Sequence, residues 1–265
     1  MRMYGWNDCP EQYRNQLDVL KERLVEHLGR NLAGIYIHGS LALDSFRPNV
    51  SDLDVIALLN EDIEVDLRFE LVKVLLAISN QPAPLEISLV TKNAIWPWKY
   101  PTPFQLHSSE YWRTRYEEQV QKGNKSFWSE TPTDSDLACH IRLINRKGIC
   151  LYGTPIKEAF PDVPERDFRS SILGDVQYAA NALSTQPVYG ILTLCRILSY
   201  LETGDIFSKA QAGEWALPLL PEQLRTIVVN AVHAYAGDGE RNVQFVDKDL
   251  ERFKNLMLSA IHGDQ

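Results

Sequence analysis

The sequence contains no apolar run close to the ~20 residues that a membrane-spanning helix needs. Residues 1–6 also lack the charged and apolar regions of a secretory signal peptide. We therefore expect a cytoplasmic protein. With 265 residues, the chain is long enough for one large or two modest domains, each with a hydrophobic core.

Cysteine is scarce, and its few copies lie far apart. The four cysteines show no Cys-x-x-Cys spacing: they are Cys9, Cys139, Cys150 and Cys195. Zinc sites and disulfide frameworks both need closely grouped or paired cysteines. We therefore expect buried free thiols without a chemical role.

Basic residues are also fewer than acidic ones, with 27 Lys and Arg against 35 Asp and Glu and a net charge of −8. Proteins that bind nucleic acid hold its phosphates with clustered Lys and Arg. The balance argues against a nucleic-acid partner and favours a cationic substrate. Surface carboxylates also serve solubility, so charge alone does not identify that substrate.

A glycine-serine turn and a pair of aspartates carry the strongest chemical signal. Gly39 and Ser40 follow the apolar segment 32–38, and Asp52 and Asp54 lead into another apolar segment. Residues two apart in a strand point to the same face, so both carboxylates can bind one hard cation. Mg²⁺ prefers such oxygen ligands and completes its shell with phosphates. Gly39 would let a phosphate approach the backbone at a helix N-terminus.

Each of these motifs alone has a simpler interpretation. A Gly-Ser pair after a strand is a common turn, and an Asp-x-Asp is often a solvated loop. In combination, a strand, a Gly-Ser turn, a helix and a second strand with Asp-x-Asp resemble the minimal signature of the polymerase-beta-like nucleotidyltransferases. The combination therefore predicts magnesium-dependent nucleotidyl transfer.

Apolar periodicity predicts regular structure along most of the chain. Strands are expected at residues 32–38, 53–59, 85–90 and 149–152, and helices at residues 11–28, 63–79, 134–147, 165–184, 187–203, 208–218, 221–236 and 246–262. Ser208 with Gln211 predicts a capping box, and Pro187 fits a first helical turn. Residues 93–112, rich in Trp and Pro, are expected to form an ordered loop. We predict an α/β nucleotidyltransferase domain, a mixed sheet with flanking helices, over residues 1–150, followed by an all-α helical bundle over residues 151–265.

Two further side chains have both a functional and a structural interpretation. Glu86 shares a strand face with Ser88 and could accept a proton from a reacting hydroxyl across a cleft from the aspartates. It could equally be a solvent-exposed strand residue. Trp112 could stack on a base or cover a sugar ring, or it could simply fill the core.

Beyond the minimal motif, the chain resembles the spectinomycin/streptomycin aminoglycoside adenylyltransferases over nearly its whole length. The likeness is carried by residues 37–40, 51–54, 84–88, 191–196, 203–206, 208–209 and 214–221. The runs in the second half are the more specific ones, because they separate this family from other nucleotidyltransferases.

The resemblance implies roles for residues of the first half of the chain. Gly39 and Ser40 would grip the phosphates of ATP, and Asp52 and Asp54 would hold Mg²⁺, with two ions expected. Glu86 would be the general base and would also contact the acceptor. The implied reaction is an in-line attack of an antibiotic hydroxyl on the α-phosphate of ATP.

The resemblance also implies ligand contacts elsewhere in the chain. Arg196, Lys209 and Tyr235 match positions that reach the nucleotide, and Trp112 matches a residue that borders the drug site. Gln186 and Tyr189 lie in the stretch where streptomycin-using members carry a Trp and acidic residues. They are therefore further candidate contacts to the acceptor.

That stretch is the main departure from the family pattern, because residues 183–189 contain no acid and no Trp. The guanidinium groups of streptomycin would lose their partners, so we expect a monomeric enzyme that adenylates spectinomycin at its 9-hydroxyl and confers resistance. The alternatives are a streptomycin 3''-adenylyltransferase, a nucleotidyltransferase acting on another small molecule or a protein, and a degenerate nucleotide-binding regulator. Retention of Asp52, Asp54 and Glu86 argues against the last.

Overall fold

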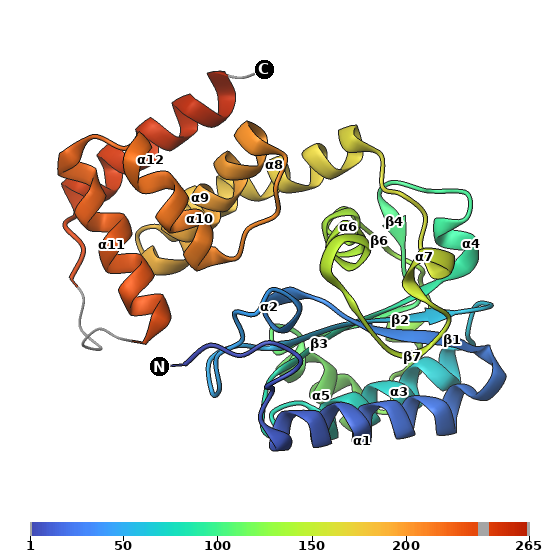
Figure 1. Ribbon diagram of the computed structural model, residues 1–265. Helices are drawn as coiled ribbons and strands as arrows, with labels where there is room; N and C mark the ends of the chain where they lie inside the picture. Colours follow the sequence, from blue (N-terminus) through green and yellow to red (C-terminus); the bar gives the residue numbers. More distant parts are fainter. Residues whose placement is uncertain (1, 238–243, 264–265) are drawn as a thin grey trace. The chain divides into compact units, whose positions relative to one another are not determined.

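The computed structural model describes residues 2–237 and 244–263 (Figure 1). Contacts between residues divide the chain into two compact units. The first is Tyr4–Phe168, and the second is Arg169–Gln265 together with Met1–Met3. The first unit contains a mixed sheet with flanking helices and the second is helical, which confirms the predicted fold class.

A five-stranded sheet forms the centre of the first unit, in the order β5-β3-β2-β1-β7. Its strands are β1 (Leu32–Ile37), β2 (Leu53–Leu59), β3 (Leu85–Thr91), β5 (Leu106–Ser108) and β7 (Ile149–Gly153). β2 and β3 are parallel, and the other neighbouring pairs are antiparallel. The last residues of β1 and β5 therefore lie beside the first residues of β2 and β3, at the same end of the strands.

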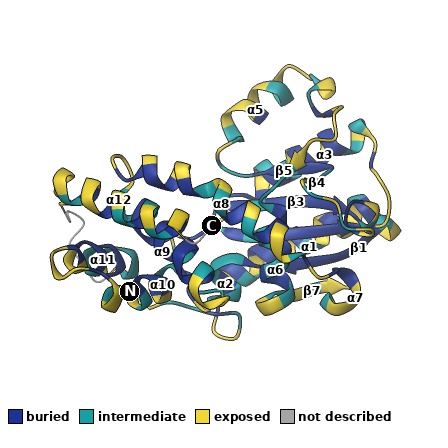
Figure 2. Ribbon diagram, turned by 90° about the horizontal axis from the view of Figure 1, so that it is seen from above, coloured by how far each residue is buried: buried dark blue, intermediate teal, exposed yellow. Residues whose placement is uncertain are grey.

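Helices flank this sheet on both faces (Figure 1). They are α1 (Glu11–Leu28), α3 (Val65–Ile78), α6 (Leu137–Lys147) and α7 (Ile156–Ala159). The apolar stripe of α1, including Leu17 and Leu24, is buried with Val55 of β2 in one hydrophobic core. On the opposite face, the ring of Phe160 packs edge-on against Tyr36 of β1, with centroids 4.7 Å apart. Figure 2 shows the strands as mostly buried and the outer helix faces as exposed.

The Trp- and Pro-rich segment, expected to be a loop, contains short regular elements. These are α4 (Lys92–Ile95), β4 (Thr102–Pro103), which pairs with β6 (Thr133–Asp134), and β5. The indole N–H of Trp96 donates to the carbonyl of Ala159 (3.1 Å), and that of Trp98 donates to Asp167 (2.9 Å). Part of this segment therefore stabilises the fold of the first unit.

Helix α5 (Arg113–Gln121) was not among the predicted elements. Tyr116 is its buried residue, and the rest of the helix is strongly polar. A helix that buries so little has no apolar periodicity to reveal it.

The first unit extends beyond residue 150, where the sequence analysis places the domain boundary. β7 joins the sheet beside β1. Arg142 of α6 donates to the carbonyl of Val163 (3.1 Å), and its guanidinium lies 4.9 Å from the ring centroid of Phe168. These contacts hold the segment after β7 to the first unit, so the division falls after Phe168, within α8 (Glu165–Ala182).

The described part of the second unit contains the remainder of α8, four further α-helices and the short 3-10 helix Leu217–Leu219. The four α-helices are α9 (Pro187–Thr203), α10 (Lys209–Ala216), α11 (Glu222–Ala236) and α12 (Asp247–Gly263). Pro187 stands in the first turn of α9, and Ser208 and Gln211 form a capping box on α10, which confirms both local predictions. Gly190 lets α9 approach α8 closely, since a Cβ there would lie 2.6 Å from the carbonyl oxygen of Ala179. Among the described residues, no helix is long and apolar enough to cross a membrane.

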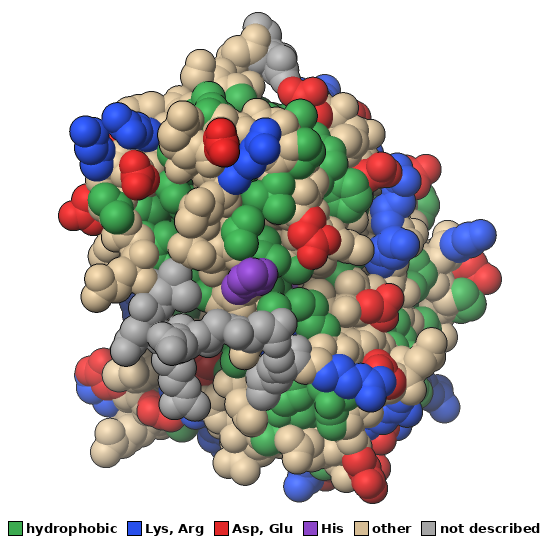
Figure 3. Space-filling view, turned by 60° about the vertical axis from the view of Figure 1, so that its left-hand side comes forward, with side chains coloured by type: hydrophobic (Ala, Val, Ile, Leu, Met, Phe, Trp, Pro, Cys, Tyr) green, Lys and Arg blue, Asp and Glu red, His purple; other side chains and the backbone are tan. Residues whose placement is uncertain are grey.

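Charged side chains of both signs are mixed on the face that Figure 3 shows. Lys and Arg stand among Asp and Glu, with apolar side chains between them. Among the described side chains of this face, Lys and Arg form no continuous stripe.

All four cysteines are free thiols, as expected, but they are not all buried. Cys9 and Cys195 are buried, Cys139 is half-buried and Cys150 is exposed. The prediction of burial is therefore wrong for Cys150. β7, which carries Cys150, lies at the edge of the sheet and leaves this side chain accessible.

Candidate active site

Three carboxylates, those of Asp52, Asp54 and Glu86, meet where the inner strands β2 and β3 begin. We call this end of the strands the acidic edge. Asp54 and Glu86 are register partners on these parallel strands, and Asp52 stands two residues before Asp54. Ligand oxygens of the three residues all lie within 4.8 Å of one another. All three side chains are half-buried. Three hard oxygen donors at this spacing fit Mg²⁺, whose charge would relieve their mutual repulsion.

Gly39 occupies a position where the backbone requires glycine. Its φ is +60°, and a Cβ there would lie 1.6 Å from Oδ2 of Asp54. The backbone N–H of the preceding residue, His38, donates to the carbonyl of Asp54 (2.9 Å). The short helix α2 (Gly39–Ala42) begins here. The Gly-Ser turn thus lies directly against the acidic edge.

Ser40 of the same turn presents an unsatisfied hydroxyl. Its Oγ is buried and has no hydrogen-bond partner among the residues that the structure describes. A buried hydroxyl without a partner is costly, and a phosphate oxygen would satisfy it. The predicted phosphate-binding turn therefore has a hydroxyl donor for an anion.

Two adjacent aromatic residues follow the end of β5, which pairs with β3 near the acidic edge. Trp112 stacks on Tyr116, with centroids 5.9 Å apart, and packs against the hydrophobic core. Tyr111 is 86% exposed and stands edge-on to Trp112 at 5.2 Å. Tyr111, which the sequence analysis did not single out, offers more free ring surface to a ligand than Trp112 does.

An ion pair fixes the turn that carries these aromatic residues. Arg113 donates to both carboxylate oxygens of Glu110, at 2.7 and 2.9 Å, and the Ser79 hydroxyl also donates to Glu110. These bonds hold the pKa of Glu110 below its ordinary value, and the bond from Arg113 has the largest effect. Ser79 also accepts the N–H of Leu85, the first residue of β3. The aromatic turn is therefore tied to the strand that carries Glu86.

Three histidines that the sequence analysis did not single out lie near the same edge. The rings of His38 and His140 pack at a tilt, with centroids 4.6 Å apart, and Nδ1 of His107 lies 3.0 Å from Oγ of Ser88. Burial, and to a smaller extent His140, lowers the pKa of His38 well below its ordinary value. These side chains come from different elements, so no local sequence pattern could have brought them together.

Four of the predicted ligand contacts of the second unit form one cluster. The ammonium of Lys209 lies over the rings of Tyr189 (5.2 Å) and Tyr235 (5.8 Å). Burial, and then the negative charge of Asp175, raises the pKa of Tyr189, and the positive charge of Arg196 acts against that rise. Gln186, just before α9, is exposed. A cationic and aromatic cluster of this kind can hold an anionic, planar ligand.

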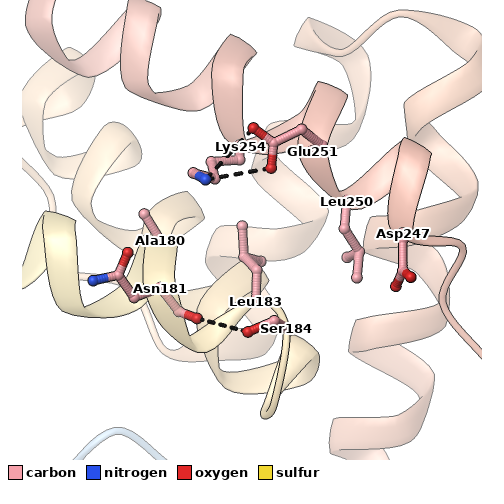
Figure 4. A pocket seen from close by; sticks show the side chains of 8 residues that line it. All are labelled: Ala180, Asn181, Leu183, Ser184, Asp247, Leu250, Glu251 and Lys254. Atoms are coloured by element: carbon pink, nitrogen blue, oxygen red, sulfur yellow. Dashed lines mark hydrogen bonds and ion pairs between the residues drawn. The ribbon is translucent and has the colours of Figure 1, made fainter.

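A separate cavity of about 440 Å³ lies in the second unit and contains none of the predicted site residues (Figure 4). It is lined by Ala180, Asn181, Leu183, Ser184, Asp247, Leu250, Glu251 and Lys254. Glu251 and Lys254 form an ion pair with each other across one side of it. The cavity therefore does not coincide with the residues that the sequence motifs single out.

A mixed sheet with a Gly-Ser turn against three converging carboxylates defines the nucleotidyltransferase class of enzymes. Two family models match the chain. The Nucleotidyltransferase domain matches residues 17–122, and the Aminoglycoside adenylyltransferase, C-terminal domain, matches residues 158–260. The second half of the chain is thus similar to the C-terminal domain of the aminoglycoside adenylyltransferases, and the first half to the nucleotidyltransferase domain.

Curated relatives and a solved structure agree with this assignment. The chain is 29% identical to a Spectinomycin 9-adenylyltransferase of Staphylococcus aureus, with 95% of each chain covered. It is 26% identical to an Aminoglycoside (3'') (9) adenylyltransferase of Klebsiella pneumoniae, covering 93% of this chain and 94% of the relative. The crystal structure of spectinomycin adenyltransferase AAD(9) from Enterococcus faecalis, with ATP and spectinomycin, is 25% identical and superposes with a TM-score of 0.80, covering 94% of this chain and 99% of that one.

Proposed function

We propose that this protein transfers AMP from ATP to the 9-hydroxyl of spectinomycin and thereby confers resistance to that antibiotic. The observation that carries the proposal is the convergence of Asp52, Asp54 and Glu86 beside the Gly39 turn. The likeness to a structure solved with ATP and spectinomycin supports the choice of both substrates.

The chemistry follows from the donor set at the acidic edge. The acceptor oxygen attacks the α-phosphorus of ATP, the bond from that phosphorus to the bridging oxygen breaks, and pyrophosphate leaves with the bonding electrons. Glu86 takes the proton of the hydroxyl as general base. Mg²⁺ held by Asp52 and Asp54 would neutralise negative charge on the phosphates and orient them.

We infer nucleotide contacts for Gly39, Ser40, Arg196, Lys209 and Tyr235. Gly39 and Ser40 would grip the phosphates, and the unsatisfied Ser40 hydroxyl supports this role. Arg196 and Lys209 would supply positive charge, and Tyr235 would supply ring surface to the nucleotide. The grouping of Lys209 with Tyr235 supports their acting together.

For the acceptor we propose contacts with Trp112, Gln186 and Tyr189, and we add the exposed ring of Tyr111. Residues 183–189 carry no carboxylate to pair with a guanidinium group. Each missing charged hydrogen bond costs about 1.5–3 kcal/mol, so two would weaken streptomycin binding by roughly 10²-fold or more. The Klebsiella pneumoniae relative, named for both the 3'' and 9 positions, makes a streptomycin 3''-adenylyltransferase the second candidate.

The test is pyrophosphate release from Mg–ATP with spectinomycin, streptomycin and a third aminoglycoside as acceptors. We expect rapid release with spectinomycin, with a product heavier by one AMP group in mass spectrometry, and slow release with streptomycin. Asp54→Asn serves as the inactive control. Comparable rates with both drugs would show that other residues pair with streptomycin. Release with neither drug would overturn the antibiotic assignment.

A further inference from the structure

His107 occupies a defined place on the sheet next to the proposed general base. It is the register partner of Ser88, across from β3 on β5. Ser88 lies two residues after Glu86, and strand residues two apart point to the same face. His107 therefore stands diagonally beside Glu86 on the face of the sheet that also carries Asp54.

Two contacts orient the His107 side chain, and a third holds its backbone. Its Nδ1 lies 3.0 Å from the Ser88 hydroxyl, and its ring stands edge-on to Phe104, with centroids 6.1 Å apart. The hydroxyl of Tyr116 donates to its backbone carbonyl (2.8 Å). A ring held at one nitrogen and packed against a second ring has little freedom to rotate.

The surroundings of His107 favour its neutral form. Burial lowers its pKa; the charges of Glu86 and Asp134 oppose that shift, and His140 adds to it. In a neutral imidazole the hydrogen bond at one nitrogen decides which nitrogen carries the proton. Nδ1 and the Ser88 hydroxyl share one hydrogen bond, and a Ser88 hydroxyl that donates to Nδ1 would leave the proton on Nε2. Nε2 makes no hydrogen bond to any residue that the structure describes, and a carboxylate is the partner it suits best.

We propose that His107 is a positioning residue for Glu86. Ser88 holds Nδ1, and the Nε2–H orients the Glu86 carboxylate so that one of its oxygens faces the acceptor hydroxyl. This inference rests on the proposed function, because that function assigns Glu86 the proton. Partners that orient a reacting carboxylate or a metal-bound side chain typically change activity by about 10–100-fold when removed.

Two substitutions of His107 distinguish the role of Nδ1 from the role of Nε2. His107→Asn keeps a polar group near the Nδ1 position and removes Nε2, whereas His107→Gln extends to the Nε2 position. We expect His107→Asn to lower kcat for spectinomycin adenylation by roughly 10–100-fold with KM values for ATP and drug little changed. His107→Gln should recover a large part of that loss. An unchanged kcat, or equal effects of the two substitutions, would overturn the proposal.

The Glu86→Gln background tests whether His107 acts through Glu86. Residues that act as one unit show non-additive effects, so His107→Asn should have little further effect once Glu86 no longer accepts a proton. The same fractional loss in both backgrounds would show that His107 acts independently of Glu86, contrary to the proposal. Thermal unfolding of each variant identifies any loss due to misfolding.

A second measurement does not depend on activity. In protein labelled with ¹⁵N-histidine, we expect the His107 ring as the Nε2–H tautomer, with resonances that shift in Glu86→Gln. Glu22→Gln, on the outer surface of α1, is the matched control and should leave them unchanged. Resonances that do not respond to Glu86→Gln would overturn the inference. Responsive resonances in a protein without drug-dependent pyrophosphate release would instead overturn the proposed function alone.

Discussion

Substituting Gly39 by alanine should inactivate the enzyme while leaving it folded. The left-handed φ of +60° at this residue costs a non-glycine residue roughly 1–2 kcal/mol. The smaller conformational entropy of the unfolded alanine chain offsets about 0.4–1 kcal/mol of that cost. The backbone effect on the free energy of unfolding is therefore about 1 kcal/mol, which a folded domain tolerates.

The steric effect is the larger one, and it falls on a single side chain. The new Cβ would lie 1.6 Å from Oδ2, 2.3 Å from Cγ and 2.8 Å from Cβ of Asp54. Carbon atoms in ordinary contact are about 3.5–4.0 Å apart. Either the Asp54 carboxylate leaves its place among the three acids or the turn moves away from it. A displacement of about 1 Å at a reacting centre can cost roughly 10²-fold in rate.

Gly123 provides the matched control within the same unit. Its φ is +64°, but a Cβ there would meet nothing within 4 Å. Gly123→Ala should therefore lose about 1 kcal/mol of stability and keep its activity, whereas Gly39→Ala should lose at least roughly 10²-fold in pyrophosphate release at saturating Mg²⁺. Thermal unfolding should show a loss of about 1 kcal/mol for Gly123→Ala and a larger loss for Gly39→Ala, with both proteins folded. Equal activity of the two variants would refute the argument that Gly39 makes room for Asp54.

Three further substitutions test other parts of the site. Asp54→Asn should abolish magnesium-dependent turnover and leave the unfolding temperature without ligand equal or higher, because it relieves repulsion among three acids; near-normal turnover at millimolar Mg²⁺ would argue against the metal assignment. Glu86→Gln should slow turnover by roughly 10²–10⁴-fold and keep ATP binding in calorimetry. Loss of binding with unchanged turnover would show that Glu86 binds substrate and does not accept the proton. Glu110→Gln should lower the unfolding temperature at neutral pH. Because Arg113 lowers the folded-state pKa of Glu110, its stabilisation is present above the unfolded-state pKa and is lost as pH falls through the folded-state value. The difference from wild type should therefore shrink below about pH 4, and a constant difference would contradict the ion-pair explanation.

Much of the fold follows from local patterns in the sequence. The apolar stripe of α1, the Pro187 start of α9 and the capping box at Ser208 each depend on residues within a few positions of one another. The strands β1, β2 and β3 are likewise visible as short apolar runs. α5 escapes prediction because it buries little beyond Tyr116.

Other features depend on contacts between distant parts of the chain. β5 is three residues long, and β7 reaches the sheet only through its pairing with β1. Strand pairing is non-local, so neither its partner nor its register can be read from a short segment. The extent of the first unit to Phe168 has the same cause, because side chains such as Arg142 bridge segments far apart in sequence.

The sequence by itself indicated the class of chemistry, because the Gly-Ser turn and the carboxylates Asp52, Asp54 and Glu86 are, in combination, residue types suited to phosphate and Mg²⁺. Only the tertiary structure decided how these residues meet. The parallel register of β2 and β3 pairs Asp54 with Glu86, and the antiparallel register of β5 sets His107 against Ser88. The physical reason is that residue identity sets which ligands are possible, whereas hydrogen bonding between strands sets which side chains lie next to one another at the strand ends.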